Sequence, residues 1–63
     1  MIAHICINKT DQITFESALE LCPHLIFKIR TSERFKDSLF YDIDYLDAAD
    51  LFDLGWNYKR LKG

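Results

Sequence analysis

Two cysteines and two histidines are the side chains of this sequence best suited to hold a metal. They occur as His4-Ile-Cys6 and Cys22-Pro-His24, and two Cys with two His form a common tetrahedral zinc site. Each pair has one residue between its members, whereas the pairs of known zinc sites usually have two or more. We therefore expect reduced cysteines that pack as small hydrophobic side chains, and we keep a zinc-stabilised structural domain as an alternative.

The same side chains are the candidates for nucleophilic catalysis, which needs a nucleophile, a base and an orienting group in one pocket. Neither a glycine-rich loop nor a nucleophile elbow accompanies them in the sequence. We predict that the protein is not an enzyme and that it uses no cofactor.

The stretch from residue 37 to residue 56 is rich in aspartate and contains no Lys or Arg. The spacing of Asp42, Asp44 and Asp47 is partly similar to a calcium loop, but an EF-hand needs Gly at its sixth position and Glu at its twelfth. Those positions hold Asp47 and Asp53, so the pattern does not predict a calcium site. The aspartates of the stretch are Asp37, Asp42, Asp44, Asp47, Asp50 and Asp53.

Asp47, Asp50 and Asp53 are three residues apart, which predicts an acidic ridge along one helix face. Carboxylates at this spacing repel one another, and aspartate is a mediocre helix former. A ridge that costs helix stability is expected to serve a contact, in which it meets Lys and Arg of a partner while Leu46 and Leu54 act as apolar anchors.

Hydrophobic periodicity predicts four strands and two helices. The first helix begins near Thr14 and ends before Pro23, and the second begins after Asp44, turns Tyr45, Ala48, Ala49, Leu51 and Phe52 inward, and stops at Gly55. The first strand is apolar on both faces and is expected at the centre of the sheet. This order is β-α-β-β-α-β, a compact ferredoxin-like α+β fold with two short helices on one face of a small sheet. The expected strands are residues 2–8, 24–31, 39–43 and 56–61.

Length and composition predict a single domain over residues 1–63. Nine aromatic side chains are too many for so small a domain to bury, so some of them should reach the surface and mark a contact site or a dimer seam. The apolar runs are far shorter than the roughly 20 residues that span a bilayer, and no basic region precedes the first of them. We expect a cytoplasmic protein that does not enter membranes.

Nucleic-acid binding is the alternative from another class, with Lys28, Arg30, Lys59 and Arg60 on a basic sheet face. The glycine-aromatic run of an RNA-binding sheet is missing, and a pI near 5.5 opposes phosphate-driven affinity.

The leading hypothesis is a small inhibitor or regulator that blocks a basic surface of a larger, nucleic-acid-handling protein. Its carboxylates would take the place of phosphates. Its size and acidity are similar to those of virus-encoded inhibitors of bacterial defence, such as anti-CRISPR proteins. This is an analogy with a class of proteins, and no sequence motif supports it. A homodimer is compatible with this hypothesis. The candidate partner-binding residues are Asp42, Asp44, Asp47, Asp50, Asp53, Leu46, Leu54, Phe35, Phe40 and Trp56.

Overall fold

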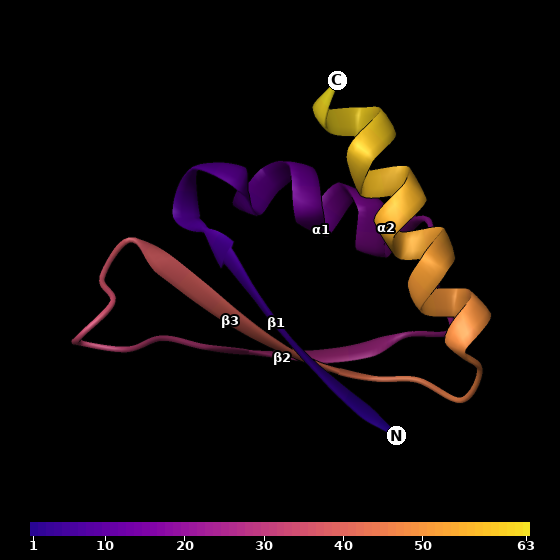
Figure 1. The fold of residues 1–63 in the computed structure, drawn as a ribbon, viewed down its shortest axis with the longest axis horizontal. Coiled ribbons are helices and arrows are strands. Elements are labelled where there is room, and N and C mark those ends of the chain that lie inside the picture. The colour runs from indigo at the N-terminus through magenta and orange to yellow at the C-terminus, as the bar shows by residue number, and fades with distance from the viewer.

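The computed structural model describes all residues from Met1 to Gly63 and shows a three-stranded antiparallel sheet with two helices on one side (Figure 1). This arrangement confirms the predicted α+β class. A 3-10 turn at Lys9–Asp11 leads from the first strand into the first helix. The elements are β1 (Ile2–Asn8), α1 (Gln12–Glu20), β2 (Ile26–Arg30), β3 (Ser38–Asp44) and α2 (Ala48–Lys62).

The strand order is β1-β3-β2, so β3 and not β1 is the central strand. Tyr41 of β3 lies between Ile5 of β1 and Ile29 of β2. Because both outer strands run antiparallel to β3, they are parallel to each other and are joined through α1, as in a split β-α-β unit. The prediction of a central first strand was wrong, since helices cover only one of the two apolar faces of β1.

The predicted fourth strand is absent, because Trp56–Leu61 form the last turns of α2. Leu51, Leu54 and Tyr58 continue one apolar stripe across Gly55, which stays helical. The helix ends instead at Gly63, which has the only positive φ (92°) and donates its N–H to the carbonyl of Lys59 at 3.2 Å. The ferredoxin-like β-α-β-β-α-β order is therefore wrong in its final element.

The expected first helix is present, and its predicted apolar stripe packs on the sheet. Phe15, Ala18, Leu19 and Cys22 are buried. The helix begins at Gln12, slightly before the predicted cap, because the 3-10 turn already brings the chain into helical geometry.

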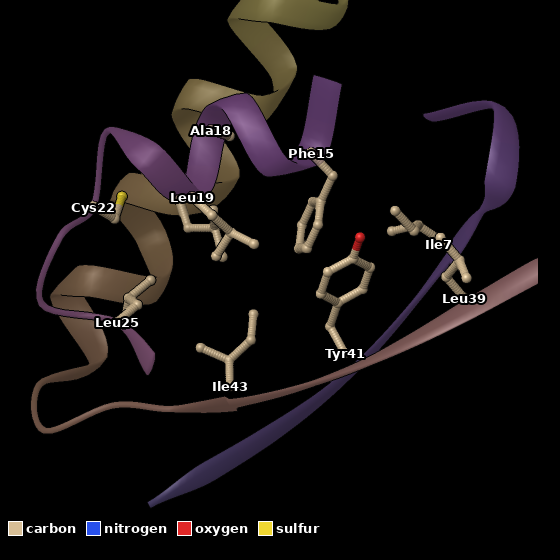
Figure 2. Close-up of a cluster of buried hydrophobic side chains, with 10 residues drawn as sticks. Ile7, Phe15, Ala18, Leu19, Cys22, Leu25, Leu39, Tyr41 and Ile43 are labelled. Carbon is tan, nitrogen blue, oxygen red and sulfur yellow. The ribbon is translucent and has the colours of Figure 1, made fainter. Parts of the chain in front are cut away.

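The core fills the space between the helices and the face of β3 that carries Tyr41 and Ile43 (Figure 2). The Phe15 ring from α1 stands edge-on to Tyr41, with centroids 4.7 Å apart, and to Tyr58 of α2 at 5.4 Å. Such edge-to-face pairs add to the stabilisation from burial. The buried side chains are Ile7, Phe15, Ala18, Leu19, Cys22, Leu25, Leu39, Tyr41, Ile43 and Leu54.

Helix α2 is rotated relative to the prediction. Asp47, not Asp44, caps it, and its Oδ1 accepts the N–H of Ala49 at 3.0 Å. With the helix running to Lys62, the stripe through Leu54 covers the sheet, and Phe52 is turned outward with 78% of its surface exposed. None of the helices has the length and apolar character that crossing a membrane requires.

Candidate protein-binding surface

The structure distributes the predicted partner-binding residues over four places. Phe35, Phe40 and Asp42 lie at the sheet face that no helix covers, which we call the open face. Asp44, Leu46 and Asp47 lie in or beside the connection between β3 and α2, Asp50, Asp53 and Trp56 lie on α2, and Leu54 lies in the core.

Leu54 is not an anchor for a partner, because only 2% of its surface is accessible. It shares the inner side of α2 with Leu51 and Tyr58, and it packs in the core beneath the helix. Its function is to hold α2 on the sheet.

The carboxylate of Asp42 forms hydrogen bonds with two other side chains of the protein. Its Oδ2 accepts Nε of Arg30 at 2.7 Å, and its Oδ1 accepts Nη2 of Arg30 at 2.9 Å and Nδ1 of His4 at 2.7 Å. The hydrogen bonds from Arg30 and then from His4 lower the pKa of this carboxyl to about 2, and the same bond raises the pKa of Arg30. Asp42 and Arg30 thus satisfy much of each other's hydrogen-bonding capacity within the chain.

Phe35 and Phe40 form a small aromatic cluster near the end of the open face. Their ring centroids are 6.3 Å apart, and the guanidinium groups of Arg34 and Arg30 lie 5.4 Å and 6.0 Å from the centroids of Phe35 and Phe40. Arginine over an aromatic ring is an attractive arrangement. The cluster thus mixes apolar and positive character, and it is separate from the other predicted anchors.

The remaining acids gather where β3 leads into α2, and we call Asp44, Leu46, Asp47 and Asp50 the acidic end. Asp44 lies 3.4 Å from the amino group of Met1, Asp47 caps the helix, and Asp50 is partly exposed in the first turn. Leu46 projects from this group with 92% of its surface exposed. Of the predicted ridge, Asp50 and Asp53 lie on α2 about one turn apart, and Asp47 lies at the N-cap of the helix.

Sequence reasoning predicted Trp56 as an anchor but missed the helix face on which it lies. This outer face of α2 consists of Ala48, Ala49, Phe52, Trp56 and Lys59. Trp56 is 67% exposed, and with Lys59, Arg60 and Gly63 it lines a surface hollow. The available signal was the spacing of Phe52 and Trp56, which share one side of any helix that continues past Gly55.

The basic residues of the nucleic-acid alternative do not form one surface. Lys28 and Arg30 lie on the open face of the sheet, since they share the alternation that includes Asp42. Lys59 and Arg60 lie on α2, on the other side of the sheet (Figure 1). The predicted basic face is thus split in two.

The residues of the zinc alternative are also separated. Cys6 is exposed and lies on the open face, whereas Cys22 is buried at the end of α1 under the helices. The expectation that both thiols pack in apolar surroundings is wrong for Cys6, because its face of β1 is uncovered. No group of three or more His, Cys, Asp or Glu side chains has an arrangement that could hold a metal ion.

A groove of about 410 Å³ runs between β1 and α2. Ile5 and Ile7 form one wall and Leu51 and Tyr58 the other. An ion pair of Lys62 with Asp11, at 3.3 Å, lies at this groove and raises the pKa of the lysine.

No protein-family model matches the chain, and neither a curated protein nor a solved structure is found to be similar to it. Its binding properties are therefore inferred from its own surface, which has two conspicuous parts, the acidic end and the outer face of α2.

Proposed function

We propose that the protein is a small, non-catalytic binding module that occupies a basic surface of a larger protein through its acidic end. The observation that carries this proposal is Leu46, 92% exposed in a stretch whose acids are Asp44, Asp47 and, in the first turn of α2, Asp50. A projecting apolar side chain gains free energy only when a partner covers it, and neighbouring charges select which partner does so.

The partner is expected to present Lys and Arg side chains around a small apolar pocket. No Lys or Arg occurs from residue 37 to residue 58, and the positive group that pairs with this end is the amino group of Met1, 3.4 Å from Asp44. A surface of this kind is typical of proteins that bind nucleic-acid phosphates, and the module would act by covering it. By analogy of class, the partner would be a component of bacterial defence.

Nucleic acid itself is less well supported as the ligand. The four basic side chains lie on opposite sides of the sheet, and Arg30 is already paired with Asp42. We therefore retain the protein partner as the proposal.

The test is capture from nuclease-treated lysate of the native host, with wild type and two variants. The first variant, Asp44→Asn with Leu46→Asn and Asp50→Asn, keeps Asp47 because that side chain caps α2. The matched control, Glu20→Gln with Leu21→Asn and Asp37→Asn, likewise removes two carboxylates and one leucine, all of them exposed and outside the acidic end.

The expected result is a basic protein that wild type and control retain and the acidic-end variant loses. Its release should increase steeply with salt, and it should bind less nucleic acid when the module is present. Equal capture by the acidic-end variant and the control would contradict the proposal, as would retention of nucleic acid alone from untreated lysate.

A further inference from the structure

The outer face of α2 is more apolar than a solvated helix face needs to be. Phe52 and Trp56 lie one turn apart on it, with 78% and 67% of their surfaces exposed. The whole chain leaves 4792 Å² accessible, more than the roughly 4,200 Å² that the size scaling of monomeric proteins gives for 7.5 kDa. This excess belongs to the chain as a whole, and the two exposed aromatic rings of α2 are the part of the surface that is typical of a contact site.

The residues along this face have the spacing of a helix–helix seam. Ala49, Phe52, Trp56, Lys59 and Gly63 follow one another at intervals of three and four residues, the repeat that keeps one stripe against a second helix. The aromatic rings occupy the middle of the stripe. Its ends carry the small residues Ala49 and Gly63, which allow two helices to approach closely.

The charges beside this seam complement each other only when the helix meets a reversed copy of itself. Asp53 and Arg60 are seven residues apart and lie on the same flank. Neither forms an ion pair within the chain, and Arg60 contacts only the amide oxygen of Asn57, at 3.1 Å. In an antiparallel pair, Asp53 of each chain would face Arg60 of the other. A parallel pair would place this flank of each helix against the opposite flank of the other, so Asp53 and Arg60 would not meet.

We infer that the outer face of α2 binds the same face of a second copy of this chain, antiparallel, about a two-fold axis that passes near Trp56. The helix dipoles are then opposed, which is also favourable. The last turns of α2 extend away from the sheet in Figure 1. This inference does not rest on the proposed function, because the acidic end is outside the seam.

The dimer interface should be small, and dimer formation should be reversible. One helix pair buries less surface than a standard interface, so the dissociation constant is expected on the order of micromolar. The measurement is the molar mass in solution over a series of concentrations, by light scattering or sedimentation. Wild type should change from 7.5 kDa toward twice that mass as the concentration rises.

Charge exchange tests the proposed arrangement. Arg60→Asp alone places four acids around the axis, and Asp53→Arg alone places four bases there, so each should raise the dissociation constant at least tenfold. The double variant Asp53→Arg with Arg60→Asp should restore the dimer. Lys28→Asp, on the open face of the sheet, is the matched control and should leave the mass curve unchanged. Circular dichroism would verify that each variant folds, which their exposed positions favour.

The direction of pairing is tested by disulfide formation in a Cys6→Ser background. Chains with Asp53→Cys should cross-link to chains with Arg60→Cys but not to themselves, whereas in a parallel pair positions 53 and 60 would not meet and this cross-link should be missing. A chain that remains monomeric at every concentration overturns the inference. A dimer that survives both single charge variants also overturns it, because its interface must then lie elsewhere. Monomeric protein whose Phe52 and Trp56 are needed to capture a different protein would assign the face to that partner.

Discussion

Arg30 extends across the open face of the sheet to Asp42, with Nε 2.7 Å from Oδ2 and Nη2 2.9 Å from Oδ1. Arg30 stands opposite Phe40 in the strand register, so its side chain crosses diagonally to the next residue on that face. The sequence placed these two residues in rival binding surfaces, one acidic and one basic. In the structure the two side chains form hydrogen bonds with each other, so they belong to neither of the two predicted surfaces.

The ion pair predicts a specific loss of stability in acid. The pKa of Asp42 is lowered from 3.8 to about 2, mainly by the hydrogen bond from Arg30. The carboxylate therefore stabilises the folded state above the pKa of the unfolded chain, and this contribution disappears as the pH falls from about 4 to about 2. Asp42→Asn should be less stable than wild type at neutral pH, and the difference should vanish across that interval. Because the pair is at the surface, high salt should reduce the difference. Identical acid-unfolding curves would contradict the pairing.

Tyr41 predicts a loss of stability in alkali. Burial, and then the hydrogen bond from its hydroxyl to Oε2 of Glu16 at 3.1 Å, raises its pKa from 10.0 to about 12. The unfolded chain loses this proton first, so the stabilisation is complete below about pH 10 and is lost as the pH rises toward 12. Absorbance of tyrosinate should show a step near pH 12 that Tyr41→Phe removes. At neutral pH the same variant should cost about 1 kcal/mol through the lost hydrogen bond. A titration that Tyr41→Phe leaves unchanged would contradict the burial of this hydroxyl.

Truncation of two leucines in the acidic stretch should change the stability of the protein by very different amounts. Leu54→Ala removes a side chain that is 2% exposed and should lower the free energy of unfolding by about 2–5 kcal/mol. Leu46→Ala changes a side chain that is 92% exposed and should stay within about 0.5 kcal/mol of wild type. Urea unfolding followed by circular dichroism measures both. A stable Leu54→Ala protein would mean that α2 does not pack as described.

Gly55→Ala should stabilise the protein. Gly55 lies within α2, and a Cβ added there would meet no atom within 4 Å. Alanine in a helix interior is favoured over glycine by roughly 0.5–1 kcal/mol. If Gly55 were instead the left-handed end of a shorter helix, alanine would be destabilising. The sign of the change in thermal midpoint therefore distinguishes a continuous helix from the predicted fourth strand.

The parts of the fold that were predictable from sequence are those in which local pattern and tertiary packing agree. The alternation of Leu39, Tyr41 and Ile43 with Phe40 and Asp42 is typical of a strand and separates the two faces of β3, and Pro23 marked the end of the first helix region. The end of the chain was ambiguous, because a glycine before Trp56 permits either a stop or a weak point in a longer helix. Only the packing of Leu54 and Tyr58 on the sheet decides between them.

The candidate site was harder to predict for a related reason. Asp44 and Asp47 are equally good caps by type, and the choice between them determines whether Phe52 faces the core or the solvent. Pairing across strands is also invisible in the sequence, so the contact of Arg30 with Asp42 could not be foreseen. The acids near Leu46 stay a prediction that depends less on such information, because they are close together in the sequence.

The central position of β3 also orders the events of folding. β2 and β3 are joined by residues 31–37 alone, so their hairpin closes a short loop, whereas β1 must wait for β3 across residues 9–37. Closing the longer loop costs more chain entropy. The hydrogen bonds that offset this cost cannot form until β3 is in place. We therefore expect the hairpin to form early, and β1, with the Phe15 ring that packs on Tyr41, to dock last. Substitutions at Ile7 would then change mainly the rate of unfolding, and those at Ile43 the rate of folding.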